Sequence, residues 1–136
     1  MTFNYSNIAI DVRENLKNSY SEAWQRLALP GCWWTGTERV AMAAESRKAF
    51  HCNLCQRRKK SLSPYTVEGQ HDHSGQLPDI AVDAIHRIVT DQGRITKSWV
   101  DKILAEGLSD GHYVELLGVV VMVFSIDVFN RGIGAE

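Results

Sequence analysis

"LLGVVVMVF", Leu116 to Phe124, is the longest apolar run in the chain, and it decides the fold class. Its valines would suit a β-strand, but the run continues without a break to Asn130, and no other segment has the pattern of a partner strand. A single strand cannot form a sheet. The run has about half the length that a membrane-spanning helix needs. We therefore predict a buried core helix and an all-α fold.

Apolar residues recur at steps of three and four along the rest of the chain, as they do in amphipathic helices. In residues 11–29 they include Val12, Leu16 and Tyr20. Residues 66–76 hold two glycines and no apolar period, and they are predicted to form a loop. Further helices are predicted over 38–61, 78–89, 97–106 and 110–130, beginning near Thr35 or Thr37, Pro78, Thr96 and Ser109 respectively.

Length and composition indicate one soluble domain of 136 residues, with an N-terminal helix and turn over 1–34 and a core over 35–136. The net charge of -1 gives no basic field that would attract nucleic acid or an anionic membrane, so neither partner is expected. The first residues do not resemble a secretory signal. We therefore expect a cytoplasmic protein whose three cysteines are thiols rather than structural disulfides.

Two of the cysteines, Cys52 and Cys55, form a CxxC pair within "ESRKAFHCNLCQRRKK". A helix from 37 to 61 would place Glu45, Cys52 and Cys55 on one face, and sulfurs at i and i+3 can come within disulfide range. The thiolate is the reactive form of cysteine. The cations that follow at 57–60 either favour that thiolate or form a solvated helix face. Glu45 is a candidate base for the thiol proton.

A metal site is the alternative interpretation of the same segment. Cys52 and Cys55 are followed after fifteen residues by His71 and His73, and these four side chains would supply the ligands of a tetrahedral zinc ion. The protein would then be a zinc-binding or non-catalytic oligomeric module. The loop histidines have two other interpretations: an imidazole that folds over the cysteines as an acid or base, or no role.

Two segments together resemble a known family. "TERVAMAAESRKAFHCNLC" and "ILAEGLSDGHYVELLGVVVMVFSIDVFNRGIG" are similar, in this order, to the alkylhydroperoxidase D-like / carboxymuconolactone decarboxylase superfamily, especially its uncharacterised peroxidase-related members. The resemblance implies an all-α helical bundle that forms homo-oligomers and carries a thiol redox centre without a cofactor. It also implies that Cys55 reacts with a small hydroperoxide or disulfide, that Cys52 resolves the product as a disulfide, and that an external dithiol reduces the pair.

The chain departs from the family pattern at two positions. The pattern places a histidine four residues after the second cysteine, where this chain has Lys59, and an acid twelve residues before the first, where it has Val40. We expect Glu45, with His71 or His73, to rebuild the proton relay from other positions. The decarboxylase branch does not use a cysteine pair, so a lactone decarboxylase is not predicted.

Other residues have structural interpretations. Trp33 and Trp34 are predicted core or subunit-interface anchors with Cys32 as a small buried neighbour, and His86 is predicted to be a core histidine rather than a ligand. Asp127, within the apolar final helix, needs a partner on another helix or subunit. Because that helix is apolar nearly all round, a homo-oligomer is expected.

Overall fold

The fold was analysed in a computed structural model, which describes residues 3–135. These residues form six α-helices and three short 3₁₀ turns and contain no strand, so the prediction of an all-α fold is confirmed. The apolar run lies inside the last helix. The α-helices are α1 (Glu14–Leu27), α2 (Gly36–Lys48), α3 (Asn53–Lys60), α4 (Asp79–Thr90), α5 (Lys97–Ala105) and α6 (Asp110–Gly132), and the 3₁₀ turns are η1 (Ala49–His51), η2 (Pro64–Thr66) and η3 (Gln92–Arg94).

Three helices begin at the residues expected to cap them. The side chains of Thr35, Thr96 and Ser109 each accept a hydrogen bond from the backbone N–H three residues later, which satisfies one of the free donors at a helix start. Thr35 forms a full capping box with Glu38, whose carboxylate accepts from the Thr35 N–H at 2.9 Å. Glu38 therefore has a structural role as part of the cap at the start of α2.

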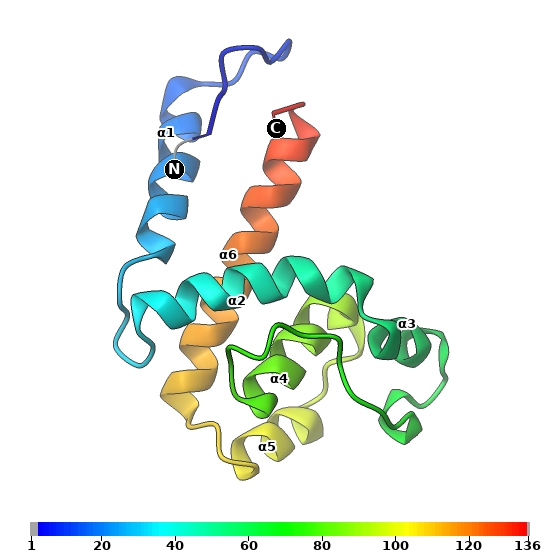
Figure 1. The fold of residues 1–136 in the computed structure, drawn as a ribbon. Coiled ribbons are helices and arrows are strands. Elements are labelled where there is room, and N and C mark those ends of the chain that lie inside the picture. The colour runs from blue at the N-terminus through cyan, green and yellow to red at the C-terminus, as the bar shows by residue number, and fades with distance from the viewer. Residues whose placement is uncertain (1–2, 136) are drawn as a thin grey trace.

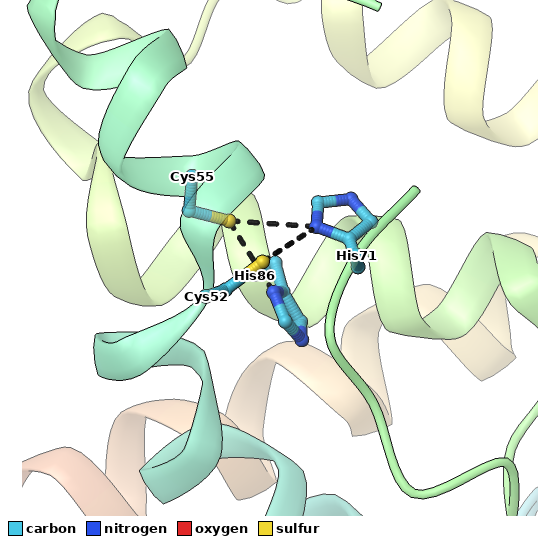
Figure 2. A group of neighbouring side chains, drawn as sticks. All are labelled: Cys52, Cys55, His71 and His86. Carbon is cyan, nitrogen blue, oxygen red and sulfur yellow. Dashed lines mark hydrogen bonds between the residues drawn. The ribbon is translucent and has the colours of Figure 1, made fainter. Parts of the chain in front are cut away.

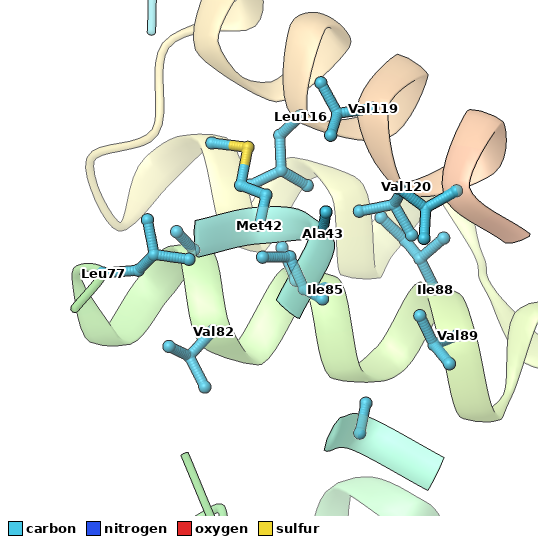
Figure 3. Close-up of a cluster of buried hydrophobic side chains, with 14 of the residues drawn as sticks. Met42, Ala43, Leu77, Val82, Ile85, Ile88, Val89, Leu116, Val119 and Val120 are labelled. Carbon is cyan, nitrogen blue, oxygen red and sulfur yellow. The ribbon is translucent and has the colours of Figure 1, made fainter. Parts of the chain in front are cut away.

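Helices α2, α4 and α6 pack against one another and enclose the core (Figure 1). Met42 of α2, Ile85 of α4 and Leu116 of α6 are fully buried where the three helices meet (Figure 3). Helix α1 packs along the C-terminal half of α6, where the rings of Tyr20 and Phe129 stack with centroids 3.9 Å apart. The core thus fixes α2 and α4 in contact, and the site described below lies beside that contact.

Helix α6 is buried along one side only. Seven of its residues are buried, whereas apolar side chains such as Val114, Val121 and Val128 are exposed on other faces. By length and composition alone the helix is also apolar enough to cross a membrane, a property that core helices of soluble proteins share. The Asp127 side chain does find a partner, because it accepts two hydrogen bonds from Arg47 of α2, at 2.8 and 3.0 Å.

The turn between α1 and α2 is held by one carboxylate of α6. Glu115 accepts hydrogen bonds from the backbone N–H groups of Cys32, Trp33 and Trp34 at 2.8 to 3.1 Å. Trp34 is buried, as expected of a core anchor, and its indole N–H donates to the carbonyl of His112. Trp33 is 53% exposed. The prediction that Cys32 is buried is wrong, because the turn leaves this thiol exposed to solvent.

Candidate functional site

The chain changes direction at the first cysteine. Helix α2 ends at Lys48, the turn η1 follows, and Cys52 has an extended backbone (φ -71°, ψ 122°) before α3 begins at Asn53. The prediction of a continuous or slightly bent helix over 37–61 is therefore wrong, because a 3₁₀ turn and an extended residue separate two helices. Cys52 is instead the N-cap residue of α3, and Cys55 lies in the first turn of that helix. Backbone N–H groups at a helix start favour a thiolate.

Four side chains from three parts of the chain converge at this point (Figure 2). Cys55 Sγ lies 3.3 Å from Nδ1 of His86 on α4 and 3.4 Å from Nδ1 of His71 in the loop before α4. Cys52 Sγ lies 3.6 Å from the same His71 nitrogen. Both sulfurs therefore face imidazole nitrogens and lie on the same side of α3.

A carboxylate holds the outer nitrogen of each histidine. His86 Nε2 lies 2.7 Å from Oε1 of Glu45 on α2, and His71 Nε2 lies 2.8 Å from Oδ1 of Asp83 on α4. A carboxylate accepts a hydrogen bond from an N–H group, so each bond places a hydrogen on Nε2 and directs Nδ1 toward the sulfurs. The cluster has two parallel chains, from Glu45 through His86 to Cys55 and from Asp83 through His71 to both cysteines.

The cluster is almost entirely shielded from water. Cys52 and His86 are 0% exposed, Glu45 is 1% exposed and Cys55 is 4% exposed. The loop before α4 closes over the cysteines: the Asp72 N–H contacts Cys52 Sγ at 3.4 Å, and its carboxylate accepts from the Asn53 N–H at 3.0 Å. Electrostatic interactions within such a site are stronger than the same interactions in water.

Burial and hydrogen bonding set the protonation states in this cluster. Burial alone would raise the pKa of Cys52, but bonds from the backbone N–H groups of Cys55 and Asp72 and from His71 outweigh it and lower that pKa. Burial alone would lower the pKa of His71, but its bonds to Asp83, Cys55 and Cys52 outweigh it and raise that pKa to about 10. Cys52 is thus favoured as a thiolate beside a cationic His71.

The other histidine behaves in the opposite way. Burial lowers the pKa of His86; the hydrogen bond to Glu45 opposes this effect only in part, and the nearby positive charge of His71 adds to it. Burial alone would raise the pKa of Asp83, but its bonds and charge interactions with His71 and Arg58 outweigh it and lower that pKa. His86 is therefore favoured as a neutral imidazole, with Nδ1 free to accept the Cys55 proton.

The cations at 57–60 affect the thiols less directly than the thiolate-stabilising interpretation assumed. Arg57, Lys59 and Lys60 are exposed, as in a solvated helix face. Arg58 is the member that points inward, and it contacts Oδ1 of Asp83 at 3.3 Å rather than a sulfur. It therefore supports the thiols through the Asp83–His71 pair.

The structure brings Glu45, Cys52, Cys55 and His71 together and leaves His73 outside. His73 is exposed, and its Nδ1 accepts a hydrogen bond from the Gly75 N–H at 2.9 Å. The set expected for a metal, Cys52, Cys55, His71 and His73, is therefore not assembled. The fourth member of the observed cluster is His86.

His86 and Asp83 belong to the site, although neither was predicted to be a site residue. His86 is indeed a core histidine, but its ring faces Cys55 and Glu45 rather than apolar neighbours. The sequence held one signal, an acid and a histidine at i and i+3 on a helix whose other residues are mostly apolar. Such a pair lies on one helix face and has to find polar partners when that face is buried.

A small cavity adjoins Cys55. It has a volume of about 10 Å³, about the space of one water-sized molecule, and Cys55, His71, Arg58, Arg87, Thr90 and Asp91 line it. His71 also lines an open cleft of about 420 Å³, together with residues that include His73 and Asp79. Cys55 thus lines this small cavity, whereas Cys52 does not.

No family model, curated protein or solved structure was found to match this chain.

Proposed function

We propose that the protein is a thiol-dependent oxidoreductase, similar to alkylhydroperoxidase D-like proteins, that reduces small hydroperoxides through a Cys52–Cys55 dithiol–disulfide cycle. The observation that carries the proposal is the chain from Glu45 through His86 to Cys55. Its two contacts, 2.7 Å and 3.3 Å, join a buried carboxylate, a neutral imidazole and a thiol in the order that general-base activation of a nucleophile requires.

The first step oxidises Cys55. His86 Nδ1 takes the thiol proton, and Glu45 stabilises the resulting imidazolium through Nε2. The thiolate attacks the terminal oxygen of the hydroperoxide, so that the O–O bond breaks and an S–O bond forms. Cys55 becomes a sulfenic acid, and the peroxide is reduced to an alkoxide that takes the proton from His86 and leaves as the alcohol.

The second step forms the disulfide. Cys52, held as a thiolate by N–H groups and by His71, attacks the Cys55 sulfur and displaces hydroxide, which leaves as water after taking a proton from the cationic His71. Rapid condensation of this kind protects a sulfenic acid from further oxidation. An external dithiol then reduces the disulfide and is itself oxidised, which restores both thiols.

This assignment accounts for the missing family histidine. Lys59 stands at that position and is exposed, whereas His86 contacts Cys55 from a different helix. In the proposed mechanism His86 takes the role of that histidine, and the Glu45 carboxylate takes the role of the family's acidic residue. The small cavity beside Cys55 favours hydrogen peroxide or a short alkyl hydroperoxide over a bulky one.

The test is consumption of hydrogen peroxide with dithiothreitol as reductant, using chelator-treated, metal-free protein. We expect Cys55→Ser to lose the activity. Cys32→Ser, which removes the exposed third thiol, is the matched control and should keep it. Equal rates for the wild type and Cys55→Ser would overturn the proposal.

A further inference from the structure

The four side chains of the cluster also form a complete donor set for a metal ion. Two sulfurs and two imidazole nitrogens, from Cys52, Cys55, His71 and His86, all lie within 4.8 Å of one another. Thiolate and imidazole together are the ligands that structural zinc sites use. The set differs from the one expected from spacing, because a helix residue replaces the second loop histidine.

The distances within the set fit a tetrahedron around zinc. Zinc–sulfur and zinc–nitrogen bonds of about 2.3 and 2.05 Å at tetrahedral angles place a sulfur and a nitrogen about 3.6 Å apart. The three closest sulfur–nitrogen separations in the cluster are 3.3, 3.4 and 3.6 Å. An ion would therefore need only small shifts of side chains that already face one another.

The carboxylates behind the histidines are a second, independent feature of a metal site. A zinc-bound histidine usually donates its outer N–H to a carboxylate, which fixes the tautomer and the ring orientation. Both histidines have such a partner, Glu45 for His86 and Asp83 for His71. Each pair therefore already holds its imidazole in the tautomer and orientation that a metal ligand needs, with Nδ1 directed toward the sulfurs.

Burial indicates which kind of metal site this would be. Cys52 and His86 are 0% exposed, Cys55 is 4% exposed, and the loop that carries His71 covers them. Four protein ligands in a closed environment leave no position for water or substrate, as in structural zinc sites. Two thiolates also balance the charge of a divalent cation.

We infer that the reduced chain binds one Zn²⁺ through Cys52, Cys55, His71 and His86, and that zinc and the Cys52–Cys55 disulfide exclude each other. Oxidation by a hydroperoxide takes two electrons from the two thiolates, forms the S–S bond and consumes two protons. The peroxide yields an alcohol and water, and Zn²⁺ is released because its two sulfur ligands are lost. The inference that the chain binds zinc does not depend on the proposed function. The inference that zinc inhibits peroxide turnover rests on that function.

The direct test is the metal content of the full-length chain, purified under reducing conditions without chelator. We expect one zinc per chain, released when diamide oxidises the cysteines. His73→Gln and Cys32→Ser are the matched controls and should keep the metal, because both residues lie outside the cluster. His86→Gln should lose it. Zinc no higher than in a chelator-treated blank, or zinc retained after full oxidation, would overturn the inference.

A spectroscopic measurement keeps the test valid if His86→Gln does not fold. Co²⁺ added to the reduced, metal-free wild type should give the visible absorption of a tetrahedral thiolate complex, and Zn²⁺ should displace it. An octahedral spectrum would contradict the four-ligand set.

Turnover separates this inference from the proposed function. At free zinc ten times the dissociation constant, only about one chain in eleven stays metal-free, so peroxide consumption should fall about elevenfold. Zinc binding without any peroxide turnover in the metal-free protein would refute the proposed function alone. Turnover without zinc binding would refute the zinc site alone.

Discussion

Replacement of Glu45 by glutamine tests the relay at its carboxylate end. The carboxylate is 1% exposed, and its Oε1 lies 2.7 Å from His86 Nε2. Glutamine has almost the same shape and can still present an oxygen to that N–H. The substitution therefore removes the negative charge while it preserves the packing and one hydrogen bond.

The magnitude follows from the kind of hydrogen bond that is lost. A bond to a charged group contributes about 1.5–3 kcal/mol net, and a neutral one about 0.5–1.5 kcal/mol. Glu45→Gln should thus destabilise the His86 imidazolium, and the Cys55 thiolate that forms with it, by about 1–1.5 kcal/mol. At about 1.4 kcal/mol per tenfold in rate, Cys55 should react about 5- to 12-fold more slowly.

The assay is the rate of iodoacetamide alkylation of Cys55 in metal-free protein, read by mass spectrometry of the peptide that contains it. Glu68→Gln is the matched control, since Glu68 is an exposed acid in the loop near the site, and it should leave the rate unchanged. Circular dichroism verifies that each variant is folded. An unchanged alkylation rate in a folded Glu45→Gln protein would refute the relay.

Three further predictions concern the second thiol, the core and the assembly. In a metal-free variant with Cys52 as its sole cysteine, the alkylation rate should reach its half-maximum at a lower pH than for an ordinary thiol, because the backbone N–H groups of residues 55 and 72 and the His71 imidazole outweigh burial and lower the Cys52 pKa; a half-maximum at or above the ordinary value would contradict this. Leu116→Ala, at a fully buried position, should lower the free energy of unfolding in urea by about 2–5 kcal/mol, whereas Val114→Ala, on an exposed face of the same helix, should change it by less than about 0.5 kcal/mol. Light scattering at micromolar concentration should show a homo-oligomer, because α6 exposes apolar side chains that one protomer does not cover; a monomer would refute that prediction.

The helices could be predicted from sequence because their signals are local. The caps at Thr35, Thr96 and Ser109 and the apolar periods act within a few residues, so they keep their meaning without knowledge of the fold. The run from Leu116 to Phe124 was ambiguous by itself. The absence of a possible partner strand in the sequence resolved it in favour of a helix.

The break before the first cysteine could not be predicted. Residues 49–52 contain neither glycine nor proline, so nothing local ends the helix there. Ala49 and Cys52 are both 0% exposed, and the turn between them is set by their packing into the interior. Tertiary packing of this kind overrides helix propensity.

The candidate site was only partly predictable for a related reason. Cys52, Cys55 and Glu45 are close in sequence, and helical spacing was enough to group them, even though the helix is broken. His86 joins them only because α4 packs against α2 and α3. Sequence spacing also could not distinguish His71 from His73. In the structure, the loop directs His71 toward the sulfurs, and His73 bonds to the Gly75 N–H instead.

The most direct test of the central claim is to map the product of peroxide oxidation. Trypsin should release Cys52 and Cys55 together in the peptide 49–57, because Lys48 and Arg57 flank them. After one equivalent of hydrogen peroxide, the peptide should lack two hydrogens as an internal disulfide, and dithiothreitol should restore its mass. A peptide that stays reduced, or one that gains oxygen atoms without forming the bond, would contradict the claim that these two thiols are a redox pair.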